Sequence, residues 1–268
     1  MKVIGSDEVK KLKLPKPDSH KRENGRLLII SGSKEYFGAL LYAVKTASRL
    51  VDLIYVLTTK ENQRLVSRLK SRTAEFMPVE NLKQIWSDVD AVLIGPGLGV
   101  SRKTKNLVKQ VLKSGKRAVL DADALSVLDK GLLKLLGPNH ILTPHRGEFR
   151  RVFKVSGNSS TVKKFAKLYN CTIILKGPVD IICTPDGRLG YNQTGNAGMT
   201  KGGTGDVLAG LVAAFYCKND AFTSAAAGAF VNGKAGDELY KKVGPFYDAE
   251  DLVEQIPKTM WKMLKISN

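Results

Sequence analysis

Short, uniformly apolar runs alternate along the chain with longer segments whose apolar residues recur at helical spacing. The apolar runs lie at 26–31, 53–58, 90–95, 117–121, 140–143 and 172–177. They are too short and too uniformly apolar for exposed strands, and are typical of strands buried on both faces of a parallel sheet. Segments 37–50 and 103–115 have helical periodicity, with Gly115 where a helix is expected to stop. This alternation predicts βαβ units with helices covering the sheet.

The pattern changes after residue 177. Segments 179–184 and 188–193 flank a Pro-Asp-Gly turn, which predicts an antiparallel hairpin at the sheet edge. Helices are expected over 204–217, 220–241 and 248–264. We find no internal repeat or linker, and 268 residues with 43% hydrophobic content suit one α/β domain. We therefore expect a single domain over 1–268.

Charge, cysteines and apolar runs restrict the class of protein. No apolar run reaches 18 residues, and the N-terminal stretch lacks the apolar centre of a signal peptide, so we expect a cytoplasmic protein without a membrane span. Cys171, Cys183 and Cys217 are widely spaced and are expected to be free thiols. The net charge of +18 attracts polyanions, but beyond a cluster at 10–22 the basic residues are scattered. No nucleic-acid-binding motif accompanies them, so solvated surface is favoured.

The loops that follow the predicted strands contain many residues that could bind a ligand or take part in catalysis. In open α/β sheets a ligand lies beyond the carboxyl ends of the strands. The loops there read IGPGLG (94–99), DADAL (121–125), TPHRGEF (143–149) and KGPVD (176–180). Glycines, carboxylates, a histidine and a lysine on one edge predict a crevice for a large polar ligand.

Each of these residues also has a simpler interpretation. The glycines at 95, 97 and 99 could form only a tight turn, and Asp121 and Asp123 could cap the next helix. His145 could be a solvated loop residue, and Lys176 a surface charge. Their coincidence at one edge favours a site.

The stretch NAGMTKGGTGDVLAG (196–210) opens a predicted helix with a glycine cluster. It matches neither a Walker A loop nor a dinucleotide fingerprint. Backbone N–H groups and the helix dipole at this point would bind an anion. Asp206 would repel that anion unless it accepts a proton, for example from a hydroxyl that attacks a phosphoryl group. The alternative is that Asp206 caps the helix.

The set of motifs, in this order, resembles the ribokinase-like superfamily and most closely the ADP/ATP-dependent NAD(P)H-hydrate dehydratases. The resemblance spans about residues 20–257 and also includes HKRENGRLLIISGSKEYFGA (20–39), ILKGPVDII, PDGR and NGKAGD (232–237). It implies a three-layer α/β/α sandwich with a mostly parallel central sheet and an edge hairpin.

The activity that the resemblance implies is cofactor repair. Hydrated NADH and NADPH (NADHX and NADPHX) would be phosphorylated on the C6 hydroxyl and then lose phosphate, with ADP or ATP as cosubstrate, ADP being favoured, and Mg²⁺ without dedicated protein ligands. Asp206 would be the proton acceptor. The hydrate would contact Ala39, Gly97, Gly99, His145 and Asp206, and the nucleotide Lys176, Gly177, Pro178, Val179, Asp180 and Gly205. The anion hole would comprise Gly202, Gly203, Thr204 and Gly205, with Asp121, Asp123, Glu148, Asn196 and Lys201 as further pocket residues.

The chain departs from the family pattern at three positions. Asp180 stands where Thr is common, Lys201 where a small residue is usual, and Asn232 where His is common; Lys201 would add a cation near the phosphate. The family also favours a tetramer, and without an epimerase domain in this sequence the NAD(P)HX epimerase is expected to be a separate protein. The alternatives are a ribokinase-like vitamin-precursor or sugar kinase, whose motifs overlap these, and a nucleic-acid-binding protein on this fold. The intact GGTGD favours an enzyme.

Overall fold

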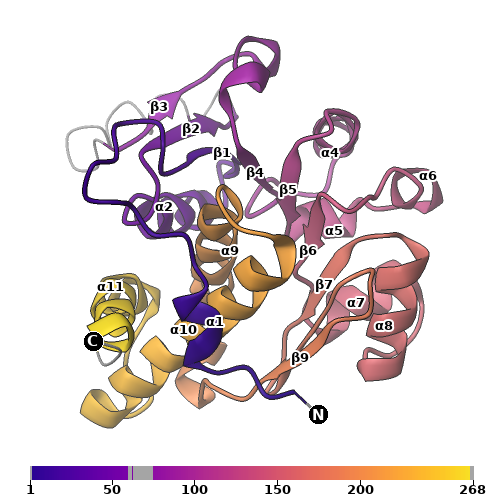
Figure 1. Cartoon of the computed structure of the whole chain (residues 1–268). Coiled ribbons are helices and arrows are strands. Elements are labelled where there is room, and N and C mark those ends of the chain that lie inside the picture. Colours follow the sequence, from indigo (N-terminus) through magenta and orange to yellow (C-terminus); the bar gives the residue numbers. More distant parts are fainter. Residues whose placement is uncertain (1, 60–61, 63–74, 266–268) are drawn as a thin grey trace.

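A single mixed sheet organises the computed structural model, which describes residues 2–59, 62 and 75–265 (Figure 1). Its strand order is β3-β2-β1-β4-β5-β6-β7-β8-β9. Strands β1 to β7 pair in parallel, and β7, β8 and β9 pair antiparallel, as the predicted hairpin requires. The strands are β1 Arg26–Ile30, β2 Leu53–Leu57, β3 Met77–Pro78, β4 Ala91–Ile94, β5 Arg117–Leu120, β6 His140–Leu142, β7 Thr172–Leu175, β8 Asp180–Cys183 and β9 Leu189–Asn192.

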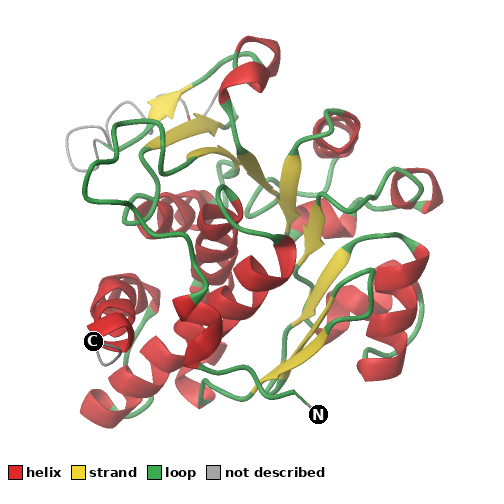
Figure 2. Cartoon of the chain, in the orientation of Figure 1, coloured by secondary structure: helices red, strands yellow, loops and turns green. Residues whose placement is uncertain are grey.

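Helices cover both faces of the sheet (Figure 2). They are α1 Ser6–Lys10, α2 Phe37–Ala47, α4 Arg102–Lys113, α5 Asp123–Ser126, α6 Lys130–Leu133, α7 Arg146–Phe153, α8 Ser159–Leu168, α9 Thr204–Tyr216, α10 Ala221–Val243 and α11 Ala249–Lys265. Short 3-10 turns lie at Leu82–Gln84, Trp86–Asp88 and Ala197–Thr200. The predicted α/β/α sandwich is confirmed. Helix α5 is the helix expected after Asp121 and Asp123, whereas α6 to α8 fall within segments for which no helix was predicted.

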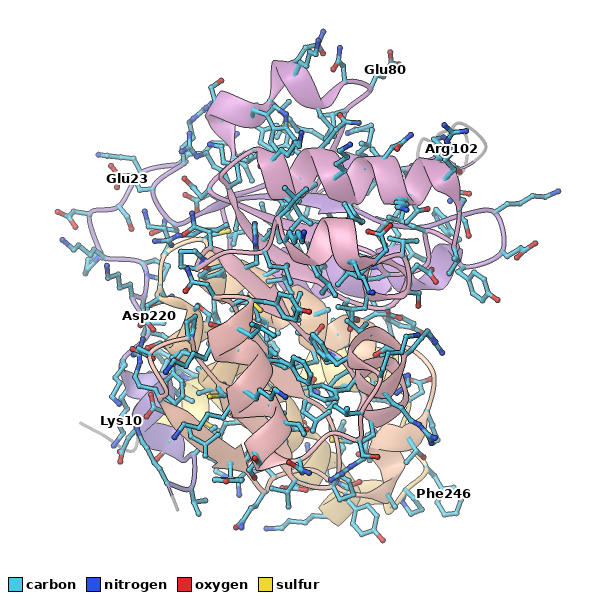
Figure 3. All side chains as sticks on the ribbon, turned by 90° about the vertical axis from the view of Figure 1, so that its right-hand side faces the viewer. Lys10, Glu23, Glu80, Arg102, Asp220 and Phe246 are labelled. Atoms are coloured by element: carbon cyan, nitrogen blue, oxygen red, sulfur yellow. The ribbon has the colours of Figure 1, made fainter. Side chains whose placement is uncertain are left out.

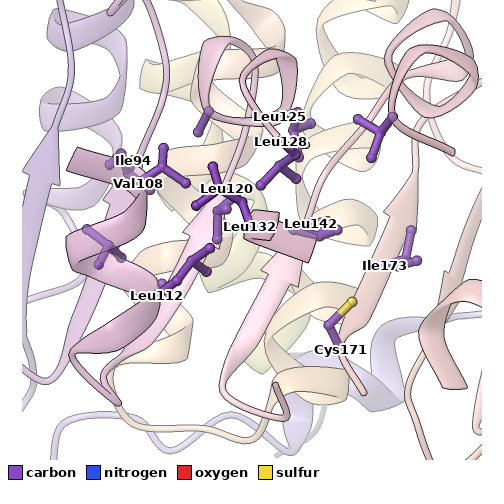
Figure 4. Close-up of a cluster of buried hydrophobic side chains, with 14 of the residues drawn as sticks. Ile94, Val108, Leu112, Leu120, Leu125, Leu128, Leu132, Leu142, Cys171 and Ile173 are labelled. Carbon is purple, nitrogen blue, oxygen red and sulfur yellow. The ribbon is translucent and has the colours of Figure 1, made fainter. Parts of the chain in front are cut away.

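The strands are apolar on both sides because each side meets a layer of helices. In β1, Leu28 and Ile30 pack toward α4, α7 and α8, whereas Leu27 and Ile29 pack toward α2, α9 and α10. Figure 4 shows part of the first layer, where Val108 and Leu112 of α4 lie beside strand residues such as Leu120. Burial on both faces explains why the strand runs do not alternate with polar residues.

Helix α9 is the central helix of the other layer. Every residue from Val207 to Tyr216 is buried, because the helix packs on β4 and β5 and is surrounded by α2, α10 and α11. A helix that is apolar all round belongs in a protein interior. Its N-terminus therefore has a fixed position at the carboxyl edge of the sheet.

Charged side chains project from separate parts of the surface, as Figure 3 shows for Lys10, Glu23, Glu80, Arg102 and Asp220. The basic residues within 10–22 are exposed. Cys171, Cys183 and Cys217 are free, as predicted, and all three are buried. Within the described residues, no helix has the length and apolar character needed to cross a bilayer.

Two glycines allow the loop after β4 to pack against its neighbours. Gly95 has a φ of +127°, and a Cβ added there would lie 1.9 Å from the Asp121 carbonyl oxygen. Gly97 has a φ of +65°, and its added Cβ would lie 2.4 Å from the Tyr36 carbonyl oxygen. Both positions require glycine for conformation and for space. The turn interpretation is thus correct, and the turn also joins three loops of the functional edge.

We predict that Gly95→Ala lowers the free energy of unfolding by about 3 kcal/mol or more, because the new methyl group collides with backbone and the φ is strained. Gly137→Ala is the matched control, since an added Cβ there meets nothing within 4 Å and its φ is not left-handed. Chemical denaturation of both variants is the measurement. Equal stabilities would contradict the close approach at Gly95.

Candidate active site

The glycine-rich loop leads into α9 through a left-handed residue. Gly203, the N-cap, has a φ of +94°, and a Cβ there would lie 2.6 Å from the Tyr42 ring. The Thr204 hydroxyl donates to the carbonyl oxygens of Met199 and Lys201 at 2.8 and 2.9 Å, which fixes the loop. The first N–H groups of a helix have no acceptor within it. The start of α9 is therefore a positioned set of donors that favours an anion.

Asp206 lies in the first turn of α9, but no side chain caps this helix, so the capping interpretation is wrong. Burial raises the pKa of Asp206 to about 7. Asp121 raises it further and Lys176 opposes the shift, while Asp123 and Glu148 contribute smaller increases. Near neutral pH this carboxyl group can both accept and release a proton, as a general base must.

Lys176 forms a buried ion pair with Asp121 directly beneath α9. Its Nζ lies 2.8 Å from Asp121 Oδ1, and the two side chains are 18% and 3% exposed, so Lys176 is not a surface charge. Thr143 donates to the same oxygen at 2.7 Å. Burial lowers the pKa of Lys176, but Asp121 and Glu148 more than offset this, and the net shift is upward. A Cβ on Gly205 would lie 3.7 Å from Nζ, which places the ammonium group at the helix N-terminus.

Asp123 and Gly99 bring a second loop to the same place. The Gly99 N–H donates to Asp123 Oδ2 at 2.8 Å. The N-cap of α5 is Ala122, with a φ of +49°, and no side chain caps the helix. The capping interpretation of Asp121 and Asp123 is therefore wrong. Both carboxylates are used to join neighbouring loops.

His145 caps α7 instead of standing free in a loop. Its Nδ1 accepts from the N–H groups of Gly147 and Glu148 at 3.0 and 3.3 Å, and Glu148 Oε2 accepts from the His145 N–H at 2.8 Å. This is a reciprocal capping box. Since Nδ1 is an acceptor, the neutral ring carries its proton on Nε2. The side chain is 57% exposed and can present that proton to a ligand.

Ala39 and Gly97 meet at the far side of this edge. A Cβ on Gly97 would lie 3.1 Å from the Ala39 Cβ, so the start of α2 packs on the loop after β4. Ala39 is half-buried. The structure thus brings the expected hydrate-binding residues to one sheet edge.

A cavity of about 630 Å³ opens beside the start of α9. It is lined by Lys176, Gly177, Pro178 and Gly205 of the expected nucleotide-binding residues, by Thr204 of the expected anion hole and by His145, which was expected to contact the hydrate. Val179 does not line it and packs against the hydrophobic core. A cavity of this size with few polar groups is typical of a small-molecule site.

Asp180 also lines the cavity, but its carboxylate is bonded to the protein. Its Oδ1 accepts from the Gly177 N–H at 3.0 Å and its Oδ2 from the Asn192 amide at 2.9 Å. Burial raises the pKa of Asp180, although both hydrogen bonds oppose the rise. Asp180 therefore shapes the KGPVD loop.

Two further expected residues have structural partners. Asn196 accepts from Gly198 and Tyr247 and donates to Asp237. Lys201 was expected near the phosphate, but its Nζ donates to the carbonyl oxygens of Pro245 and Tyr247. The charge of Lys201 is thus held by the loop between α10 and α11. Exposed Gly202 has open space around it.

Sequence reasoning did not assign Thr194, Met199, Leu208 or Asn232 to the site, although all four line the cavity. Leu208 and Asn232 lie inside helices whose pattern indicates packing. Of these four residues, only Asn232 stood out in the sequence, because it departs from the family pattern.

No group of three or more His, Cys, Asp or Glu residues in the described part of the chain is arranged to bind a metal ion. Asp121, one of the carboxylates at this edge, is already paired with Lys176. A divalent ion would therefore have to be held largely by a ligand's phosphates.

Comparison with known proteins agrees with this geometry. Residues 27–258 match the family model described as NAD(P)H-hydrate dehydratase. The chain is 35% identical to the ADP-dependent (S)-NAD(P)H-hydrate dehydratase of Cenarchaeum symbiosum, over 97% of this chain and 96% of that protein. It is 39% identical to the bifunctional NAD(P)H-hydrate repair enzyme Nnr of Methanocaldococcus jannaschii, over 96% of this chain and 52% of that protein. The chain thus spans about half the length of that relative.

Solved structures share the fold, including ribokinase-like proteins. The ADP/ATP-dependent NAD(P)H-hydrate dehydratase of Bacillus subtilis, co-crystallised with ATP and Mg²⁺, is 26% identical with a TM-score of 0.85, over 98% of each chain. The sequence motifs, the fold and the carboxylate beside an anion site at a helix N-terminus agree with the family match, and this chain belongs to the NAD(P)H-hydrate dehydratase family.

Proposed function

We propose that the protein dehydrates NADHX and NADPHX to NADH and NADPH, with ADP as the preferred phosphoryl donor. The observation that carries this proposal is Asp206, a carboxyl group with a pKa of about 7 in the first turn of α9, beside the Lys176 ammonium group. The relative of similar length is named as ADP-dependent, which supports the choice of donor. The name of the solved homologue includes both ADP and ATP.

In the first step, the C6 hydroxyl oxygen of the hydrate attacks the terminal phosphorus of the nucleotide. The bond from phosphorus to the leaving oxygen breaks, ADP becomes AMP, and the hydroxyl proton passes to Asp206. The N–H groups at the start of α9 and the Lys176 ammonium group stabilise the charge on the transferring phosphoryl group. Mg²⁺ brought by the nucleotide would neutralise the phosphate oxygens.

In the second step, the lone pair of the ring nitrogen expels phosphate from C6. Loss of a proton from C5 then restores the C5–C6 double bond. Hydroxide is a poor leaving group at neutral pH and phosphate is a good one, so the consumed nucleotide makes the dehydration feasible. The Nε2 proton of His145 is available to orient a carbonyl or phosphate oxygen of the bound hydrate.

The direct test incubates the protein with hydrated NADH, Mg²⁺ and either ADP or ATP. We expect NADH, AMP and phosphate in equal amounts with ADP, and a lower rate with ATP. NADH formation without nucleotide consumption would exclude the phosphorylation step. A stable phosphorylated product from another alcohol, with the hydrate left unchanged, would show a vitamin-precursor or sugar kinase instead.

We predict that Asp206→Asn lowers kcat by about 10²- to 10⁴-fold while the nucleotide Kd changes little, because the amide keeps the shape but cannot accept the proton. Asp7→Asn on exposed α1 is the control and should be fully active. NADH absorbance and calorimetric titration with ADP are the measurements. Activity of Asp206→Asn within a few-fold of the wild type would show that Asp206 is not the proton acceptor.

The rate should depend on pH through the same group. Because the basic form of Asp206 is required and its pKa is about 7, kcat/KM should fall about tenfold per pH unit below pH 7 and level off above it. Steady-state rates from pH 5 to 9 test this. A fall that begins only near pH 4 would indicate an Asp206 with an ordinary pKa.

Ionisation of Asp206 should lower the stability of the free protein. Its folded-state pKa lies above its ordinary value of 3.8, so ionisation disfavours the folded state progressively from about pH 4 to 7 and fully above pH 7. Asn carries no charge, so Asp206→Asn should raise the Tm by a few degrees at pH 8 and hardly at all at pH 4. An equal change in Tm at both pH values would contradict the raised pKa.

A further inference from the structure

The NGKAGD segment of α10 contains no residue that takes part in the proposed phosphoryl transfer. Gly233, Gly236 and Asp237 are three and four residues apart, so they lie on one face of the helix. A Cβ on Gly233 would lie 2.3 Å from the Thr194 hydroxyl oxygen, and a Cβ on Gly236 would lie 2.7 Å from the sulfur of Met199. The two glycines therefore allow the glycine-rich loop between β9 and α9 to lie directly on α10.

Asp237 binds the start of this loop. Its Oδ1 and Oδ2 accept from the Gly195 N–H at 3.2 and 3.3 Å, and its Oδ1 also accepts from Asn196 Nδ2 at 3.1 Å. Asp237 is not among the residues that line the cavity beside α9. Any effect of its carboxylate on a ligand in that cavity must therefore pass through the loop.

The carboxylate of Asp237 determines how the Asn196 amide is oriented. A carboxylate only accepts hydrogen bonds, so Asn196 presents its Nδ2 to Asp237. Its Oδ1 then faces the other way and accepts from the Gly198 N–H at 3.0 Å and from the Tyr247 hydroxyl at 2.7 Å. Tyr247 is fully buried, and a Cβ on Gly198 would lie 2.5 Å from its ring. The amide is thus held in one orientation between an acceptor and two donors.

The turn that begins at Asn196 leads to the start of α9. The Met199 N–H donates to the Asn196 carbonyl oxygen at 3.1 Å, and the Met199 carbonyl oxygen accepts from the Thr204 hydroxyl at 2.8 Å. Thr204 is buried and is the first residue of α9, which packs beside α10 (Figure 1). A continuous series of hydrogen bonds therefore runs from the Asp237 carboxylate to the first turn of α9.

We propose that Asp237 is a positioning residue for phosphoryl transfer: it holds the glycine-rich loop so that the N–H groups at the start of α9 point at the transferring phosphoryl group. The inference rests on the proposed function, which places the terminal phosphate of the nucleotide at this point. A displacement of about 1 Å in such groups can lower a rate about 10²-fold. Asp237 should therefore affect the terminal phosphate and leave binding of the rest of the nucleotide unchanged.

The test titrates ADP and AMP calorimetrically into the free protein, in the presence of Mg²⁺ and without the hydrate. AMP lacks the terminal phosphate, so the ratio of the AMP Kd to the ADP Kd measures what the phosphate site contributes. In Asp237→Asn an amide donor faces the donors of the loop. We expect the ADP Kd to rise roughly tenfold and the AMP Kd to stay within about twofold of the wild type. An unchanged ratio, or equal affinities of the wild type for ADP and AMP, would overturn the proposal.

Glu238→Gln is the matched control, because it removes the neighbouring carboxylate of α10. Glu238 Oε2 accepts from Gln255 Nε2 and the Thr259 hydroxyl at 2.9 and 2.6 Å, and these bonds join α10 to α11. This variant should keep the wild-type ratio of affinities. Thermal unfolding of both variants identifies a purely structural role. A lower Tm in Asp237→Asn with an unchanged ratio, or the same loss of ADP preference in the control, would overturn the proposal.

Asp237→Ala covers the case in which Asp237→Asn does not fold, because alanine favours a helix and places no donor against the loop. It should show the same loss of ADP preference, and a wild-type ratio would overturn the proposal. With hydrated NADH added, kcat of the folded Asp237 variant should fall about 10- to 100-fold. A kcat within twofold of the wild type would also overturn the proposal.

The inference and the proposed function fail separately, because the titrations contain no hydrate. Loss of the ADP preference in the Asp237 variants, without any dehydration by the wild type, would overturn the proposed function alone. Dehydration by the wild type, with an unchanged ratio of affinities in the variants, would overturn the inference alone.

Discussion

The buried ion pair between Lys176 and Asp121 joins the elements from which the site is built. Lys176 follows β7 and Asp121 follows β5, and Thr143 after β6, the strand between them, donates to the same carboxylate oxygen. Breaking such a pair by removing one partner leaves an uncompensated buried charge, which typically costs about 3–5 kcal/mol. The pair therefore fixes three loops relative to one another, and it places one positive charge at the start of α9.

The same pair sets the electrostatics of Asp206. Burial raises the Asp206 pKa most, the Asp121 charge adds to the rise, and the Lys176 charge limits it to about 7. With Asp121 alone the carboxyl group would stay protonated to higher pH, and with Lys176 alone it would be a weaker base. The balance of the two charges thus determines whether Asp206 can exchange a proton at neutral pH.

Several features of the candidate site lower the stability of the free protein. Ala122 has a positive φ, Asp206 is half-buried with a raised pKa, and Asn232 has an unpaired oxygen. Elsewhere in the described residues the strands are largely apolar and lie between two helical layers, although His140 Nε2 and Thr172 Oγ1, where β6 and β7 begin, are also buried without a partner. Local conflicts of this kind are common at functional sites.

The sequence by itself determined the architecture and predicted most of the residues of the candidate site. Uniformly apolar runs predict strands buried on both faces, and the glycine cluster with Asp206 predicts an anion site with a proton acceptor, because these patterns depend on local chain chemistry. The tertiary structure alone decided how the polar residues pair. These pairings depend on which loops lie side by side: Lys176 with Asp121, His145 as a helix cap, and Lys201 with the carbonyl oxygens of Pro245 and Tyr247.

Asn232 is the clearest case. Its helical spacing indicates packing, and only the position of α10 against α9 places this residue at a cavity, with no protein partner for its side-chain oxygen within the described residues. Helical and strand periodicity report which side of an element is buried, whereas hydrogen bonds and charges act between segments whose distance the sequence does not contain.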